Sequence, residues 1–126
     1  MHSYKLRAVV CVFALLGPIS APFADDMTYA EADALEAESQ PKEGYSEYLG
    51  EFIQFNNSYK IDERSGCYRD DGESVTILII ITYDSLVRSV LTDKDSEKAK
   101  CWRDTYEGIR VKSPPFSPFV IKMTMG

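Results

Sequence analysis

Carboxyl groups and cysteines are the side chains of this sequence with the potential for chemistry. The one histidine, His2, lies in the first residues, so the rest of the chain has no imidazole to act as a general base or zinc ligand. Two of the 20 acidic side chains could form a general acid and base pair, but no spacing among them singles out such a pair. We therefore expect a protein that is not an enzyme and has no cofactor and no metal.

The cysteines divide between an N-terminal hydrophobic segment, which contains Cys11, and the remainder of the chain, which contains Cys67 and Cys101. An even pair in a small exported domain indicates one disulfide; the alternative is two buried free thiols. In the loop-entropy model, closing a loop of about 34 residues stabilises the fold by roughly 3–4 kcal/mol.

The sequence bears on two further kinds of ligand site: a calcium site among acidic residues and a phosphate-binding loop among glycines. Asp70, Asp71 and Glu73 could ligate calcium, but they lack the spacing of a calcium-binding loop, which favours a solvated turn. The glycines are scattered and form no phosphate-binding loop.

Overall composition excludes several classes of function. The formal net charge is −6, which argues against nucleic-acid binding through phosphate neutralisation. Hydrophobic residues make up 44% of the chain and aromatic residues 12%, enough for a packed core. No apolar run reaches about 18 residues, so no stable membrane span is expected once a signal segment is removed.

Residues 1–24 are typical of a secretory signal peptide. Lys5 and Arg7 precede nine apolar or small residues (8–16), a Gly-Pro pair follows, and cleavage is expected after Ala24. The alternative is an uncleaved anchor. Cleavage would leave 102 of the 126 residues and change the net charge from −6 to −8, because two bases and no acids are lost. We expect a periplasmic or secreted protein.

Hydrophobic patterning predicts an α+β fold after this segment, in the order helix, strand, strand, helix, strand. The β-branched run at residues 75–81 is apolar on both faces, which predicts a central strand covered on both sides. The other expected elements are a helix from residue 45 that ends at the turn-forming residues 56–58, a strand at 86–91, a helix that follows the candidate N-cap residues 92–96 and stops at Gly108, and a strand at 119–125 with Pro118 at its start. Together they predict a small three-stranded antiparallel sheet with a packed helix and one disulfide.

Acidic residues are concentrated at the start of the expected mature chain. Residues 25–51 contain nine acids and one base, whereas residues 52–126 contain eleven of each. We interpret residues 25–44 as an acidic lead-in, either a weakly amphipathic helix or a solvated segment, because its apolar positions are mostly alanine. Residues 45–126 then form a single α+β domain.

The last strand and the segment before it offer candidate partner-binding residues. Pro114 and Pro115 could be a rigid connection or could present an aromatic side chain to a partner. The final strand is the best candidate for an open sheet edge, because Lys122 and Thr124 make one of its faces polar. The candidate residues are Phe116, Phe119, Ile121, Lys122 and Met123.

Several of these features occur together in a known family. Residues 71–77 (Asp-Gly-Glu-Ser-Val-Thr-Ile), the hairpin that follows, a helix with Cys101-Trp102-Arg103 and a Pro-rich segment before a last strand resemble the C-terminal domain of TonB-type energy transducers. The resemblance covers about residues 45–126. It implies a hairpin, a helix packed across it and a third strand. It also implies action by contact with outer-membrane receptors, for which strand addition at a sheet edge is one mode.

The function expected from these features is that of an exported, non-enzymatic domain that binds a protein partner in the cell envelope. It is not expected to transduce energy itself, because an acidic lead-in of about 20 residues stands where transducers have a long Pro-rich spacer. The alternative is an inhibitor or immunity protein against a basic toxin or hydrolase; a carboxylate-based hydrolase is a third hypothesis. An inhibitor should lose affinity when Glu36, Glu38, Glu43 and Glu47 are neutralised, whereas a strand-addition domain should lose binding when proline replaces Ile121.

Overall fold

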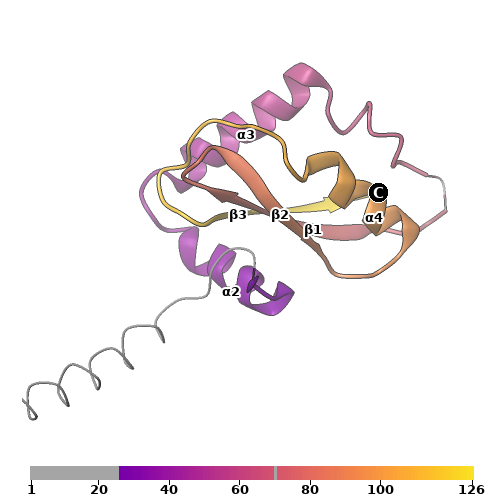
Figure 1. Cartoon of the computed structure of the whole chain (residues 1–126), viewed down its shortest axis with the longest axis horizontal. Coiled ribbons are helices and arrows are strands. Elements are labelled where there is room, and N and C mark those ends of the chain that lie inside the picture. The colour runs from indigo at the N-terminus through magenta and orange to yellow at the C-terminus, as the bar shows by residue number, and fades with distance from the viewer. Residues whose placement is uncertain (1–25, 70) are drawn as a thin grey trace, which may run out of the picture.

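A computed structural model describes residues 26–69 and 71–126. The expected signal peptide at residues 1–24 and Asp70 lie outside the described residues. Within them the chain forms an α+β fold whose elements are shown in Figure 1. In chain order they are α2 (Tyr29–Ser39), α3 (Tyr45–Tyr59), β1 (Val75–Thr82), β2 (Leu86–Thr92), α4 (Glu97–Tyr106) and β3 (Phe119–Met125).

The three strands form one antiparallel sheet in the order β2-β1-β3. β1 is the central strand, as its two apolar faces predicted, and it pairs with β2 through a hairpin and with β3 along seven residue pairs. The connection at residues 83–85 is closed by the Ser85 amide, which donates to Thr82 O at 3.0 Å. Ser85 adopts a φ of +63° there, the left-handed conformation that a short hairpin turn requires.

Helices cover both faces of this sheet, α3 and α4 on one side and α2 on the other (Figure 1). Ile77, Ile79 and Ile81 pack on α3 and α4, in the core that also holds the aromatic side chains. Leu78 and Ile80 face α2 in a smaller core. Alternate β1 side chains therefore pack in two different apolar layers, and this is why the strand is apolar throughout.

α2 occupies the acidic lead-in and is a fully formed helix. Thr28 and Glu31 form a capping box at its start: the Glu31 amide donates to Thr28 Oγ1 at 3.1 Å and the Thr28 amide to Glu31 Oε1 at 2.9 Å. Ala32 and Met27 are buried against the sheet. Because alanine contributes little area, this layer buries much less apolar surface than the layer opposite.

α3 is longer than the sequence predicted. The prediction that residues 56–58 end this helix is wrong, since it continues to Tyr59 and closes at Lys60, whose amide donates to Asn56 O and Asn57 O. Asn56 is 4% exposed, receives a hydrogen bond from Tyr106 Oη at 2.7 Å and donates to Asp62 Oδ1 at 3.1 Å. Tertiary hydrogen bonds thus override the turn preference of asparagine.

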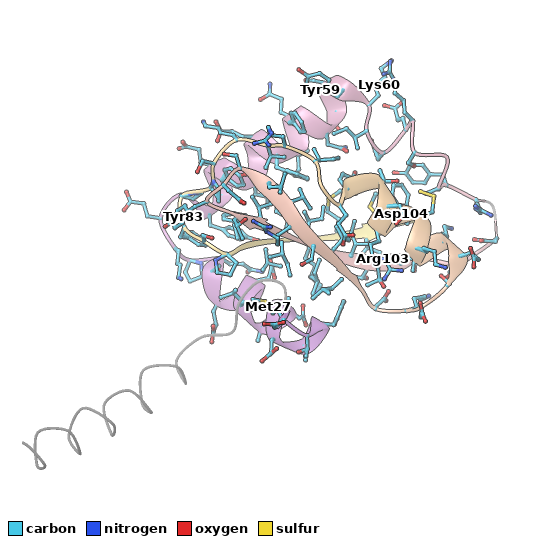
Figure 2. The ribbon with its side chains drawn as sticks, in the orientation of Figure 1. Met27, Tyr59, Lys60, Tyr83, Arg103 and Asp104 are labelled. Carbon is cyan, nitrogen blue, oxygen red and sulfur yellow. A yellow bond between two sulfur atoms is a disulfide. The ribbon has the colours of Figure 1, made fainter. Side chains whose placement is uncertain are left out.

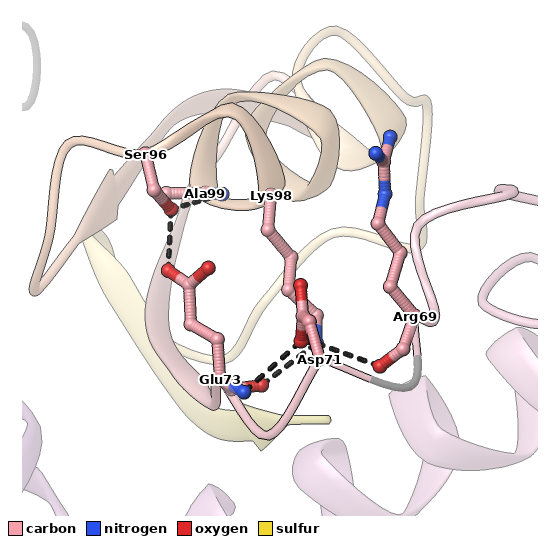
Figure 3. A network of polar contacts seen from close by, with 6 residues as sticks. All are labelled: Arg69, Asp71, Glu73, Ser96, Lys98 and Ala99. Carbon is pink, nitrogen blue, oxygen red and sulfur yellow. Dashed lines mark hydrogen bonds and ion pairs between the residues drawn. The ribbon is translucent and has the colours of Figure 1, made fainter.

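The segment before β1 is fixed to α4 at two places. The predicted disulfide joins Cys67 to Cys101, with Cα atoms 5.6 Å apart. Lys98, 2% exposed, donates from Nζ to Asp71 Oδ1 at 2.9 Å and to the carbonyls of Arg69 and Glu73 at 3.3 and 2.7 Å (Figure 3). Both contacts hold the loop that leads into the central strand.

Candidate functional site

β3 is an edge strand whose outer peptide groups can be assigned from the register. Thr76 exchanges hydrogen bonds with Asp93, so its peptide groups point toward the β2 side. The directions of the peptide groups alternate along a strand, so the N–H and C=O groups of Ile79 point toward β3. Ile79 therefore forms a hydrogen-bonded backbone pair with Ile121. The N–H and C=O groups of Val120, Lys122 and Thr124 must then point away from β1. No backbone of residues 26–69 or 71–126 pairs with them. Val120 is fully buried, so the accessible peptide groups are those of Lys122 and Thr124, which are exposed.

The opposite edge of the sheet, on β2, is occupied. The Val87 amide donates to Ile109 O and the Gly108 amide donates to Val87 O, both at 2.9 Å. Further along, the Val90 amide donates to the side chain of Glu107 at 3.2 Å. In the described part of the chain, β2 is therefore covered at its hairpin end, whereas the outer side of β3 has no backbone partner.

The five candidate partner-binding residues lie at this end of the sheet but differ in access. The side chains of Phe119 and Ile121 are fully buried in the core, so a partner cannot contact them directly. Met123 is half-buried against the same core. Lys122 lies on the α2 face, where its ammonium pairs with Asp33 Oδ1 at 2.9 Å; this pairing raises the pKa of Lys122.

Phe116 is half-buried and belongs to a packed connection. Its ring lies 5.0 Å from that of Phe119, and the Lys42 ammonium sits 4.8 Å from its centroid on the other side. Pro114 is buried, and Pro115 lies so close to Gly44 that a Cβ atom added there would be 3.0 Å from the Pro115 side chain. These contacts favour the rigid-connection interpretation of the Pro-rich segment.

The register changes the residue at which strand addition can be tested. Proline at Ile121, as the sequence suggested, would remove an amide that bonds to β1 and would damage the sheet itself. Proline at Lys122 or Thr124 removes an outward amide and leaves the β1 ladder intact. Both residues are exposed, but Lys122 forms an ion pair with Asp33, whereas Thr124 is not part of an ion pair among the described residues.

The acidic residues considered for an inhibitor surface are not equivalent. Glu36 is 6% exposed, and its carboxylate accepts hydrogen bonds from Tyr45 Oη and Gln40 Nε2, so it is not available to a partner. Burial, followed by the hydrogen bond to Glu36, raises the pKa of Tyr45 well above its ordinary value. Glu38, Glu43 and Glu47 are exposed, so they are the members of this set that could attract a basic partner.

A hollow lies between α3 and residues 111–115, at a place that sequence analysis did not identify. Tyr48 forms its base and donates through Oη to Lys112 O. Burial raises the pKa of Tyr48 to about 12, and the Glu51 carboxylate adds to the shift. Phe55 also lines the hollow. It lies within the predicted helix, but the periodicity of that helix does not show that residues 111–115 pass over this face.

Exposed aromatic side chains mark the two ends of this region. Figure 2 shows Tyr59 at the C-terminal end of α3 and Tyr83 at the hairpin end of the sheet. They are 64% and 63% exposed. Tyr59 packs on Phe55, with ring centroids 5.0 Å apart, and so continues the apolar stripe of the helix beyond the hollow.

Residues 26–69 and 71–126 offer neither a metal centre nor a membrane-spanning helix. They contain no group of three or more His, Cys, Asp or Glu side chains arranged to hold a metal ion. None of the helices in these ranges has the length and apolar character needed to cross a bilayer.

Comparison of the chain with models of protein families gives no match. Comparison with curated proteins and with solved structures likewise gives no match.

Proposed function

We propose that this chain is an exported, non-enzymatic domain that binds a protein partner by accepting a strand at the outer edge of β3. The observation that carries the proposal is the asymmetry of the sheet: residues 108–111 cover β2 at its hairpin end, whereas the exposed residues Lys122 and Thr124 of β3 direct unpaired peptide groups outward from the described fold. Main-chain pairing of this kind supplies affinity without a preformed pocket.

Two features support export and the kind of partner. A disulfide is compatible with an oxidising compartment, periplasmic or secreted, as is the expected signal at residues 1–24. The order helix, strand, strand, helix, strand from α3 onward agrees with the resemblance to the TonB C-terminal domain, whose members engage outer-membrane receptors. On this proposal the domain shares a contact mode with that family and does not itself transduce energy.

The test is affinity capture from an envelope extract, with the wild-type chain compared with Thr124→Pro and Thr124→Ala. Both variants lose the contact between Thr124 Oγ1 and Thr76 Oγ1, 3.1 Å in the wild type, but only proline removes the outward amide. A partner retained by the wild type and Thr124→Ala and lost with Thr124→Pro supports strand addition, provided that circular dichroism shows both variants folded. Equal retention by the two variants refutes it.

The second candidate is an inhibitor of a basic toxin or hydrolase, favoured by the exposed carboxylates of Glu38, Glu43 and Glu47. Their simultaneous replacement by glutamine should weaken capture of such a partner, and capture should fall as salt increases. Strand addition should be insensitive to both changes. The same extract therefore distinguishes the two functions.

A further inference from the structure

The hollow beside α3 consists of two adjoining parts that differ in chemistry. The first, of about 200 Å³, is lined by the side chains of Tyr48, Phe52, Phe55 and Val111. The second, of about 160 Å³, is lined by Gly44, Glu47, Ser113 and Pro115. Glu51 and Lys112 border both parts, and their ion pair, with Nζ 2.8 Å from Oε2, lies between them.

The size of the apolar part limits what it can hold. Pockets for small-molecule ligands usually measure about 300–1,000 Å³, whereas a dry cavity of about 150 Å³ accepts a single benzene ring. The apolar part therefore suits one aromatic or branched aliphatic side chain. Insertion of one such anchor into a walled hollow is the usual arrangement at the centre of a protein interface.

The charges around the second part indicate what should stand beside that anchor. Two carboxylates, Glu47 and Glu51, face a single ammonium, that of Lys112. The hydrogen bond that this ammonium donates to Glu51 raises the Lys112 pKa, and the charge of the nearby Glu47 adds to the shift. Glu47 is exposed. One negative charge is thus left over at the rim, which complements a lysine or arginine.

From this geometry we infer a second partner-binding site, distinct from the β3 edge, that receives an apolar anchor and an adjacent basic residue of a partner protein. The anchor enters between Phe55 and Val111, and the basic group lies over Glu47. The inference goes beyond strand addition and does not depend on it, because none of the residues lining the hollow belongs to β3.

The experiment is an NMR titration of the ¹⁵N-labelled protein with acetyl-Phe-Lys-amide, against acetyl-Phe-Glu-amide and acetyl-Gly-Lys-amide as matched probes. The Phe-Lys probe should shift the amides of Tyr48, Phe55 and Val111, with a dissociation constant on the order of 1 mM for so small a ligand. The Phe-Glu probe should bind about fivefold more weakly, and the Gly-Lys probe should leave these amides unchanged.

Variants on α3 give a second readout. Phe55→Ala should abolish the shifts at Tyr48 and Val111, whereas Ile53→Ala, which removes an exposed apolar side chain (44% exposed) outside the lining of the hollow, should retain them. The site is refuted if the Phe-Lys probe leaves these amides unshifted, if the Phe-Glu probe binds equally well, or if Ile53→Ala matches Phe55→Ala. The β3 variants at Thr124 should not alter this titration, so its failure is distinguishable from failure of strand addition.

Discussion

Replacement of Lys98 by methionine tests whether the buried ammonium holds the loop before β1 in place. Lys98 is 2% exposed and donates to one carboxylate and two backbone carbonyls. Methionine has a similar length and keeps the apolar part of the contact, but it donates no hydrogen bond. The carbonyls of Arg69 and Glu73 then lose their partner, while the carboxylate of Asp71, 41% exposed, can turn to water.

The expected loss of stability follows from these three contacts. Hydrogen bonds from a charged donor contribute about 1.5–3 kcal/mol each. The three here lie near the lower end of that range, because Arg69 and Asp71 are exposed and Glu73 is half-buried, so water can replace part of each bond. Part of this is recovered, because methionine need not be desolvated as an ammonium must. We expect Lys98→Met to lower the free energy of unfolding by about 3 kcal/mol, and to lower Tm by roughly 15 °C for a domain of this size.

The assay is urea unfolding followed by the fluorescence of Trp102, the one tryptophan in the chain, which is fully buried beside Tyr106. Lys100→Met is the matched control, because Lys100 lies on the same helix and is exposed. If Lys98→Met differed from that control by less than about 0.5 kcal/mol, the normal scale of surface substitutions, the assignment of Lys98 as the anchor of this loop would be wrong.

Three further predictions use the same unfolding assay. The hydrogen bond from the Lys98 ammonium lowers the pKa of Asp71 below its ordinary 3.8. The ionised carboxylate of Asp71 therefore stabilises the fold above that pH. As the pH falls below 3.8 through the folded-state pKa, the wild type should lose stability more steeply than Asp71→Asn. Tyr106→Phe should cost about 1–2 kcal/mol, because the buried carbonyl oxygen of Asn56 loses its donor. Gly44→Ala should lower the free energy of unfolding by about 1–3 kcal/mol, since the φ of Gly44 is +89° and the new Cβ would lie 3.0 Å from the Pro115 side chain. Gly50→Ala has open space around the new Cβ and should instead raise the free energy of unfolding by up to about 1 kcal/mol.

The sheet and the disulfide could be predicted because their signals are local and strong. A β-branched run that is apolar on both faces has few alternatives to a central strand, and two cysteines in the expected mature chain leave a single intramolecular pairing. The helix after the hairpin could be predicted because residues 92–96 offer N-cap side chains and Gly108 is a natural stop. In the structure α4 spans Glu97–Tyr106, and of the candidates Ser96 is the cap, accepting a hydrogen bond from the Ala99 amide at 3.1 Å.

The features that were missed depend on contacts between distant segments. Asn56 favours a turn by itself, and only its contact with Tyr106, 50 residues away, keeps it helical. The hollow needs Tyr48 and Phe55 from one helix and Val111 from a connection that passes over it. Which face of β3 is covered depends on α2, whose alanine positions carry almost no periodic signal. Periodicity reports the faces of one element and not the neighbour that each face meets.

The covered edge of β2 has a consequence for self-association. Sheets grow into fibrils when every copy offers two free edges, so that each new chain leaves one edge open for the next. Here residues 108–111 cover the hairpin end of β2 in the described sheet, so two copies that met through β3 would present only partly covered β2 edges to a third. Strand-by-strand growth from such a pair is therefore disfavoured.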